Sequence, residues 1–167
     1  MSERSNPLQT VPARDSILDR MRQKLLVWDG AMGTQIHNLD LSVDGDYQGC
    51  ENCTDILSLT RPDQIVEIHR DYFRAGADVV STNTFGAAAH VLSEFDRADD
   101  ARALSRSAAE IARGAVDEFA TAEWPRFVAG SLGPGTKLIT LGQIGFDDLR
   151  DSYAQAAMGL IEGGVDV

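Results

Sequence analysis

The residues best suited to chemistry lie together in one short stretch, directly after the apolar run 25–28. Asp29 offers a carboxylate that could meet a cation. The next four backbone amides could converge on an anion if the glycines adopt a positive φ; they belong to Gly30, Ala31, Met32 and Gly33. Together these groups would suit a zwitterion such as an amino acid. The alternative is a plain turn in which Asp29 caps the next element, and the stretch by itself favours that turn.

The elements that must position this stretch follow from the hydrophobic pattern. The run 25–28 contains a β-branched valine and predicts a short buried strand that ends at Asp29. A helix that begins at 60–63 and is closed by Gly76 leads to a second strand, which ends at 82–83. A polar residue at the end of a strand is well placed to face a ligand in an α/β fold.

Two longer helices, over 98–119 and 149–161, flank a third strand at 127–129. The first of these helices is expected to expose Arg113 to solvent. The second is expected to bury one apolar face, formed by Leu149, Tyr153, Ala157, Leu160 and Ile161.

An internal repeat links the segments 75–79 and 163–167. In both, a helix closes at glycine, and an Asp-Val pair then opens a strand. The second copy coincides with the last residues of the sequence. We therefore expect a fourth strand to begin there, and the chain to be the first part of a larger α/β protein.

Strands that alternate with helices predict a parallel sheet. Polar loops with glycine after each strand suit a (β/α)8 barrel, although such barrels usually need about 250 residues and this chain has 167. On the barrel interpretation, the chain holds about the first three βα units and the start of strand four. The pattern alone leaves a doubly wound sheet open as the alternative.

The composition limits the partners. The net charge is −11 and the pI about 4.5, without a Lys/Arg cluster, so neither nucleic acid nor an anionic membrane surface is an expected partner. No apolar run approaches the length of a membrane span. Residues 1–15 are polar and contain two prolines, which predicts a flexible amino-terminal arm before a folded part at 16–167. Two cysteines without a secretory signal favour a cytoplasmic setting.

Cys50 and Cys53 form a C-x-x-C pair, the spacing of half a zinc site or of a redox pair. A structural zinc site takes four ligands, and the sequence holds no second cysteine pair. Ordinary loop cysteines are therefore the favoured interpretation, with zinc binding and thiol redox chemistry as minor alternatives.

The stretch 130–137 nearly matches a phosphate-binding loop, but its Lys and Thr are transposed relative to that motif. Gly142 and Gly145 follow, so no helix begins promptly to offer its amino terminus to a phosphate. We expect this stretch to line the mouth of the barrel rather than to bind a nucleotide.

Three blocks carry a family resemblance: Val27–Thr34, a block from Leu59 to Gly86 that contains Thr82-Asn83-Thr84-Phe85, and Val128–Pro134. With these motifs the chain resembles the homocysteine S-methyltransferase family over about residues 25–167. It is most similar to the amino-terminal homocysteine-binding module of cobalamin-dependent methionine synthases. The resemblance implies that the sheet belongs to an incomplete (β/α)8 TIM barrel.

The resemblance also implies a chemistry, the transfer of a methyl group to the homocysteine thiol to give methionine. In the family a zinc ion holds the sulfur as thiolate, and methylcobalamin carries the methyl group in methionine synthases. Asp29 would take the substrate ammonium, the amides of 30–33 its carboxylate, and Thr82 and Asn83 would line the pocket. The family's zinc ligands have no counterpart in this sequence. We therefore predict no catalytic or metal-ligating residue here and expect the chain alone to be inactive.

A rival hypothesis from another class is a non-catalytic fragment or module. Such a module would need a complementary barrel half, whereas the methyltransferase interpretation adds homocysteine and a cobalamin-binding module as partners. The sequence does not decide between the two.

Overall fold

The centre of the molecule is a small parallel sheet. The computed structural model describes residues 16–167, so the predicted arm at 1–15 lies outside the described residues. Strand β1 (Val79–Ser81) pairs in parallel with β2 (Phe127–Ala129). The register places Val79 opposite Phe127 and Ser81 opposite Ala129. The prediction of an α/β fold with parallel strands is confirmed.

Shorter segments extend the sheet on both sides. Trp28 forms a parallel bridge with Val79 next to β1. On the other side, the amide of Asp166 donates to the carbonyl of Val128 at 2.8 Å. The amide of Gly130 donates to the carbonyl of Val167 at 2.7 Å. The predicted first strand and the predicted beginning of a fourth therefore lie beside β1 and β2, although neither is long enough to count as a strand.

The expected burial of the first strand is wrong. Leu25 is 94% exposed and Val27 58% exposed. Only Leu26 packs against the core residues Val79 and Phe127. Side chains alternate between the two faces of an extended segment, and this one lies at the outer edge of the described sheet, so its remaining side chains stay in solvent.

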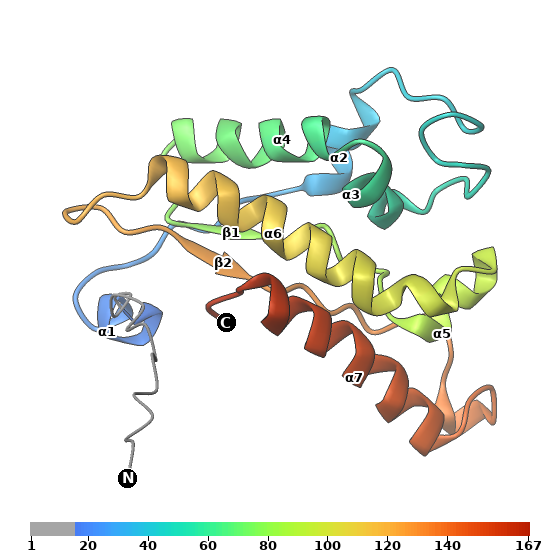
Figure 1. Ribbon diagram of the computed structural model, residues 1–167. Helices are drawn as coiled ribbons and strands as arrows, with labels where there is room; N and C mark the ends of the chain where they lie inside the picture. Colours follow the sequence, from blue (N-terminus) through green and yellow to red (C-terminus); the bar gives the residue numbers. More distant parts are fainter. Residues whose placement is uncertain (1–15) are drawn as a thin grey trace, which may run out of the picture.

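Three long helices cover one face of the sheet (Figure 1): α4 (Pro62–Arg74), α6 (Ala101–Phe119) and α7 (Phe146–Gly163). The predicted start and glycine cap of α4 are both confirmed. The helix begins at Pro62, and Gly76 follows its end with φ +105°. Side chains from α4, from α6 and from the helix-facing side of both strands form one apolar cluster. Its buried members are Phe73, Ala77, Val80, Ala112, Ala115, Val116 and Val128.

The remaining helices are short. They are α1 (Ile17–Met21), α2 (Met32–His37), α3 (Leu57–Thr60) and α5 (Ala89–Leu92). Single 3-10 turns occur at Thr54–Ile56, Ser93–Phe95, Ala98–Asp100 and Ile139–Leu141. No helix between residues 16 and 167 is long and apolar enough to cross a membrane.

Helix α7 packs against α6 through small residues, which corrects the predicted apolar face. The buried positions of α7 are Ser152, Ala156, Gly159, Leu160 and Gly163, so of the five predicted only Leu160 is buried. Ile161 is exposed. A Cβ added at Gly159 would lie 2.2 Å from the carbonyl oxygen of Arg102. The backbones approach so closely that glycine, rather than a large apolar residue, suits the contact.

Arg113 was expected to face solvent, but its side chain is buried. Its Nε donates to the carbonyl of Gly164 at 2.9 Å, and its Nη2 pairs with the carboxylate of Asp166 at 2.5 Å. The side chain is buried because it reaches from α6 to the segment beside β2. Helix periodicity cannot reveal a partner so distant in sequence.

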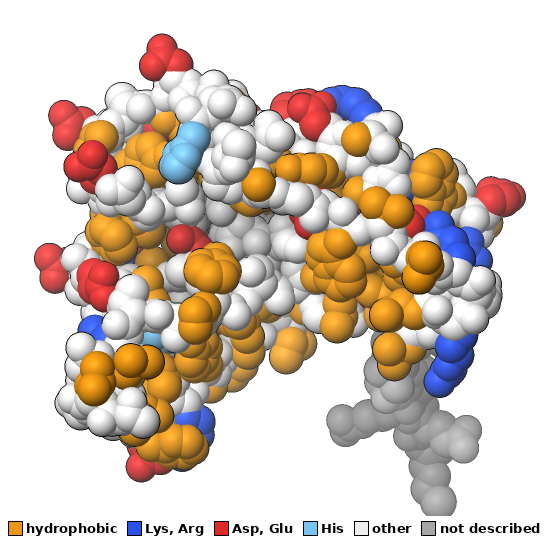
Figure 2. Space-filling model, turned by 180° about the vertical axis from the view of Figure 1, so that it is seen from behind, with side chains coloured by type: hydrophobic (Ala, Val, Ile, Leu, Met, Phe, Trp, Pro, Cys, Tyr) orange, Lys and Arg blue, Asp and Glu red, His pale blue; other side chains and the backbone are white. Residues whose placement is uncertain are grey.

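The opposite face of the sheet is covered by α1 and by Leu26, so Val79 and Phe127 are buried. Ile17 of α1 packs there against Val79, Phe127 and Ala129. Figure 2 shows the molecule from this side, where hydrophobic side chains gather over much of the surface. Exposed large hydrophobic residues of the described chain include Leu25, Trp28, Phe85, Leu141 and Ile161.

Candidate functional site

A cavity of about 330 Å³ opens where β1 ends. Four of the predicted site residues line it, namely Met32, Gly33, Thr82 and Asn83. The rest of the wall comes from Thr54, Ser81, Thr84, Phe85 and Ser131. Asp29, Gly30 and Ala31 do not line the cavity. Asp29 is nevertheless one contact away from it, because its carboxylate bonds to Ser81.

Ser81 holds both oxygens of the Asp29 carboxylate. Its amide donates to Oδ2 at 2.8 Å and its hydroxyl to Oδ1 at 3.0 Å. Burial raises the pKa of Asp29 above its ordinary value, while the hydrogen bonds from Ser81 act in the opposite direction. No Lys, Arg or His within residues 16–167 forms an ion pair with Asp29. The carboxylate therefore has no protein counter-ion in the described chain.

The backbone after Asp29 differs from the expected glycine turn. Neither Gly30 nor Gly33 has a positive φ. The turn is made instead by Ala31, with φ −49° and ψ 88°, and α2 begins at Met32. In the described chain, no hydrogen bond is donated by the amides of residues 30–33. These amides remain available at the start of α2, since the first amides of a helix have no intrahelical partner.

Thr82 ties the end of β1 to the loop after β2. Its Oγ1 accepts a hydrogen bond from the amide of Ser131 at 3.0 Å. The hydroxyl of Thr84 donates to the carbonyl of Ser131 at 2.7 Å. The two threonine hydroxyls lie 2.6 Å apart. Because the Thr84 hydroxyl already donates its proton to Ser131, the Thr82 hydroxyl must donate to Thr84. This closed set of bonds fixes one wall of the cavity.

Asn83 is buried, and its amide is engaged with the protein. Its Nδ2 donates to the carbonyl of Thr54 at 2.8 Å and to the hydroxyl of Ser58 at 3.3 Å. The side chain therefore anchors the 3-10 turn at Thr54–Ile56 beside the cavity. Asn83 contributes chiefly by building the wall.

Sequence reasoning did not single out Ser81, Ser131 or Thr54 as site residues. Ser81 offered a signal, because it shares a face of β1 with the buried Val79 yet is polar. Ser131 lies in the stretch 130–137, which was expected to line the mouth of the barrel. Thr54 reaches the cavity by the path of its loop, which sequence spacing does not reveal.

The cysteine pair does not line this cavity and lies in the core. Cys50 and Cys53 are free and buried, and they pack in a cluster with Ile56, Leu92 and Leu104. Burial raises the pKa of the Cys53 thiol to about 11. In the described part of the chain, no three His, Cys, Asp or Glu side chains gather to hold a metal ion. These observations favour ordinary core cysteines over the zinc and redox alternatives.

The stretch 130–137 packs on its neighbours. Lys137 donates through Nζ to the carbonyl of His90 at 3.1 Å and to the hydroxyl of Ser93 at 3.0 Å. The amide of Gly133 donates to the carbonyl of Phe85 at 3.1 Å. Its lysine is thus occupied, and the stretch contributes Ser131 to the cavity wall rather than a phosphate cradle.

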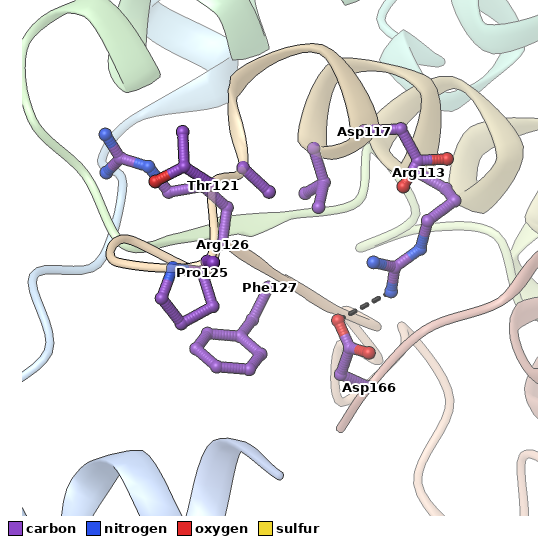
Figure 3. Close-up of a pocket in the computed structure, with 10 residues that line it drawn as sticks. Arg113, Asp117, Thr121, Pro125, Arg126, Phe127 and Asp166 are labelled. Carbon is purple, nitrogen blue, oxygen red and sulfur yellow. Dashed lines mark hydrogen bonds and ion pairs between the residues drawn. The ribbon is translucent and has the colours of Figure 1, made fainter. Parts of the chain in front are cut away.

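A second hollow, of about 400 Å³, lies at the opposite end of β2 (Figure 3). Three of its four charged side chains, all except the exposed Asp117, have protein partners. Arg113 pairs with Asp166, and the guanidinium of Arg126 stacks 3.5 Å from the ring centre of Trp124. This hollow borders the start of the strand, whereas ligands of parallel α/β sheets bind at the carboxyl ends.

Comparisons with known proteins agree with the motif blocks. A sequence model of the family described as "Homocysteine S-methyltransferase" matches residues 26–167. Methionine synthase of Mycobacterium tuberculosis is 49% identical over 150 residues, and that of Mycobacterium leprae 47%. Both matches cover 90% of this chain but only 12% of the relative, so the chain spans about an eighth of the length of these curated proteins.

Solved structures give the same fold. The metallated form of the homocysteine methyltransferase MmuM from Escherichia coli superposes with a TM-score of 0.69 at 20% identity. The match covers 89% of this chain and 54% of that one. The apo form of the same protein gives a TM-score of 0.58 at 26% identity.

Proposed function

The chain belongs to the homocysteine S-methyltransferase family, and we propose from this premise that it forms the amino-terminal part of a homocysteine-binding module in a methionine synthase-like protein. The family resemblance expected from the motif blocks is confirmed by the match over residues 26–167. Because the chain covers so little of its curated relatives, the activity of the whole protein is part of the proposal. That activity is the transfer of a methyl group to the thiol of homocysteine.

One observation carries the proposal: three separate segments converge at the carboxyl end of β1. The start of α2 brings Met32 and Gly33, β1 brings Ser81 to Asn83, and the loop after β2 brings Ser131. The volume of about 330 Å³ falls within the range of small-molecule sites. Met32 and Gly33, at the start of α2, line the cavity, and the carboxylate of Asp29 bonds to Ser81 in its wall. A carboxylate and free amides are the chemistry that an amino acid requires.

We assign the substrate-binding roles as follows. Asp29 receives the ammonium group, because its charge has no protein counter-ion among residues 16–167. The amides of Gly30, Ala31, Met32 and Gly33 receive the carboxylate at the start of α2. Thr82 and Asn83 shape the wall through the bonds that hold Ser131 and Thr54. The side chains of Met32 and Phe85 line the same cavity and offer apolar contact to a sulfur-containing side chain.

The family implies zinc and, for methionine synthases, methylcobalamin. The described residues do not fit a zinc site, because no cluster of three suitable ligands occurs among them. The chain's own contribution is therefore to bind and orient the amino acid. We infer no step in which these residues activate the sulfur.

The incomplete barrel is part of the same proposal. The order of segments in the sheet is 26–28, β1, β2 and 165–167, the order expected for consecutive units of a (β/α)8 barrel. The inner face of such a barrel would be the face with Val79 and Phe127, on which Ile17 and Leu26 pack in the described chain. A complementary barrel half, a cobalamin-binding module and a cytoplasmic setting complete the proposal.

A non-catalytic module remains the second candidate, and the exposure of the sheet edge favours it. Leu25, Val27 and Trp28 are all largely exposed at that edge. A module of this kind would leave amino-acid binding to its complement, whereas the proposed function predicts an affinity that depends on Asp29.

Calorimetric titration with L-homocysteine and with its stable thioether relative L-methionine, on the soluble complex of the chain with a complementary barrel half, tests the proposal. We expect Asp29→Asn to weaken both by at least about tenfold, since a charge-assisted contact is lost. Asp44→Asn serves as the control, because Asp44 is an exposed acid away from the cavity. Equal affinity of the Asp29→Asn variant and the unsubstituted protein would rule out the assigned role.

A further inference from the structure

Ser81 lies between the cavity and the carboxylate of Asp29. It lines the cavity, whereas Asp29 does not. It is the last residue of β1 and faces the same side of the sheet as Val79. Every side-chain hydrogen bond that Asp29 accepts in the described chain comes from this one residue.

The direction of each hydrogen bond follows from the groups present. The indole Nε1 of Trp28 can only donate, so its 2.9 Å contact makes the Ser81 oxygen an acceptor. The serine proton is then free to point at Oδ1 of Asp29, 3.0 Å away. The serine amide holds Oδ2 at 2.8 Å. Trp28, Ser81 and Asp29 thus form a chain of hydrogen bonds with a single direction.

The two hydrogen bonds from Ser81 fix the Asp29 carboxylate at both of its oxygens. A carboxylate held at one oxygen can still rotate about its Cβ–Cγ bond, whereas two bonds from one rigid strand residue set its plane. Each oxygen keeps a further lone pair for a ligand. The hydrogen bonds also favour the ionised form against the effect of burial.

We propose that Ser81, itself held by Trp28, is a positioning residue that orients the Asp29 carboxylate toward the ammonium group of a bound amino acid. The identity of the ligand as an amino acid rests on the proposed function. The orientation of Asp29 by Ser81 does not, because it can be measured without a ligand. Ser81 acts through Asp29 and is not itself a catalytic residue.

The first measurement is a ligand-free titration of Asp29 by carboxyl ¹³C NMR on the soluble protein. Ser81→Ala should raise the pKa of Asp29 by about one unit, because the hydroxyl bond to the ionised form is lost. Ser81→Thr keeps a hydroxyl on a strand residue and should restore the value. Trp28→Phe should also raise the pKa of Asp29, by less than Ser81→Ala does. Ser16→Ala is the control, since the Ser16 hydroxyl makes no capping hydrogen bond.

The second measurement is the affinity for L-methionine across pH. Ser81→Ala should lower it about tenfold at neutral pH and move its acidic limit to higher pH, and Ser81→Thr should recover both. If Ser81→Ala leaves the pKa and the affinity unchanged while Asp29→Asn abolishes binding, the positioning role is overturned and the proposed function stands. If Asp29→Asn changes nothing, the proposed function fails, and the ligand-free titration still decides the role of Ser81.

Discussion

The carboxylate of Asp78 accepts a hydrogen bond from the amide of Val27 at 2.9 Å, and the amide of Asp78 donates to the carbonyl of Val27 at 2.7 Å. Asp78, which directly precedes β1, thereby bonds to both the amide and the carbonyl of one residue in the neighbouring segment. Asp166 repeats the arrangement with Val128, at 2.8 Å for each of the two bonds. The repeated Asp-Val pair in the sequence thus corresponds to a repeated device that sets the register of adjacent parallel segments.

Asp78→Asn should destabilise the fold. The buried carboxylate also accepts bonds from Lys24 at 2.7 Å and from the indole of Trp124 at 2.6 Å. An amide cannot accept from all of these donors, and we expect a loss of about 2–3 kcal/mol in the free energy of unfolding. Denaturant unfolding followed by circular dichroism measures it, with the exposed Asp99→Asn as the control. Equal midpoints for Asp78→Asn and the control would contradict the role.

The same substitution should change the pH dependence. Burial alone would raise the pKa of Asp78, but the bonds from Lys24, Val27 and Trp124 outweigh it and hold the pKa below its ordinary value. The unfolded chain therefore takes up the proton first as the pH falls. The contribution of Asp78 is complete above about pH 4 and is lost as the pH falls further through the folded value, so the two proteins should converge in stability at low pH.

His69→Leu should make stability less sensitive to mild acid. His69 is fully buried on α4, neither ring nitrogen has a hydrogen-bond partner in the described chain, and burial lowers its pKa from 6.5 to about 4. The unfolded state binds the proton first, so folded stability falls by up to roughly 3 kcal/mol between pH 6.5 and 4. Unfolding midpoints across this range should flatten in His69→Leu but not in His37→Gln, where the histidine is exposed. An unchanged slope in His69→Leu would contradict the prediction.

Much of the fold was accessible from the sequence because it depends on local patterns. The apolar spacing and the closing glycine predict α4, and the short apolar runs 79–80 and 127–129 predict β1 and β2. The burial of Arg113 could not be predicted, because its partners Gly164 and Asp166 are distant in sequence. The contact face of α7 could not be predicted either, because it depends on how closely α6 and α7 approach. At the site, the shared edge of parallel strands predicts that Thr82 and the stretch after Asp29 come together, whereas the clamp by Ser81 depends on register.

The packing of α7 on α6 gives a sharp test. Gly159→Ala would place a methyl group 2.2 Å from the backbone oxygen of Arg102, which cannot move without displacing α6. We expect a loss of about 1–3 kcal/mol from overpacking. Gly114→Ala is the matched control, since Gly114 lies on the exposed side of α6 with nothing within 4 Å. The control should gain about 0.5–1 kcal/mol from helix propensity. Similar thermal midpoints for both variants would disprove the close contact.

The purified chain should hold no stoichiometric zinc. Cys50 and Cys53 are buried among apolar side chains, and burial raises the pKa of Cys53 to about 11, so the thiolate that zinc requires is disfavoured. Elemental analysis by mass spectrometry, after purification in zinc-containing buffer, measures the metal content. One tightly held zinc ion per chain, lost in Cys50→Ala, would refute this expectation.

The chain on its own should be aggregated, dimeric through a sheet edge, or only partly ordered. Within residues 16–167, Leu25 and Val27 at the sheet edge are 94% and 58% exposed, whereas Val79 and Phe127 are buried against Ile17 and Leu26. Burying a residue such as Val or Leu contributes ~1.5–3 kcal/mol, a sizeable share of the ~5–15 kcal/mol that stabilises a domain. Unpaired edges also invite pairing with a second chain. Light scattering and amide exchange test this, and co-expression with a complementary barrel half should yield a soluble complex. A stable monomer with strongly protected amides in β1, β2 and residues 26–28 would show that this part of the fold stands alone.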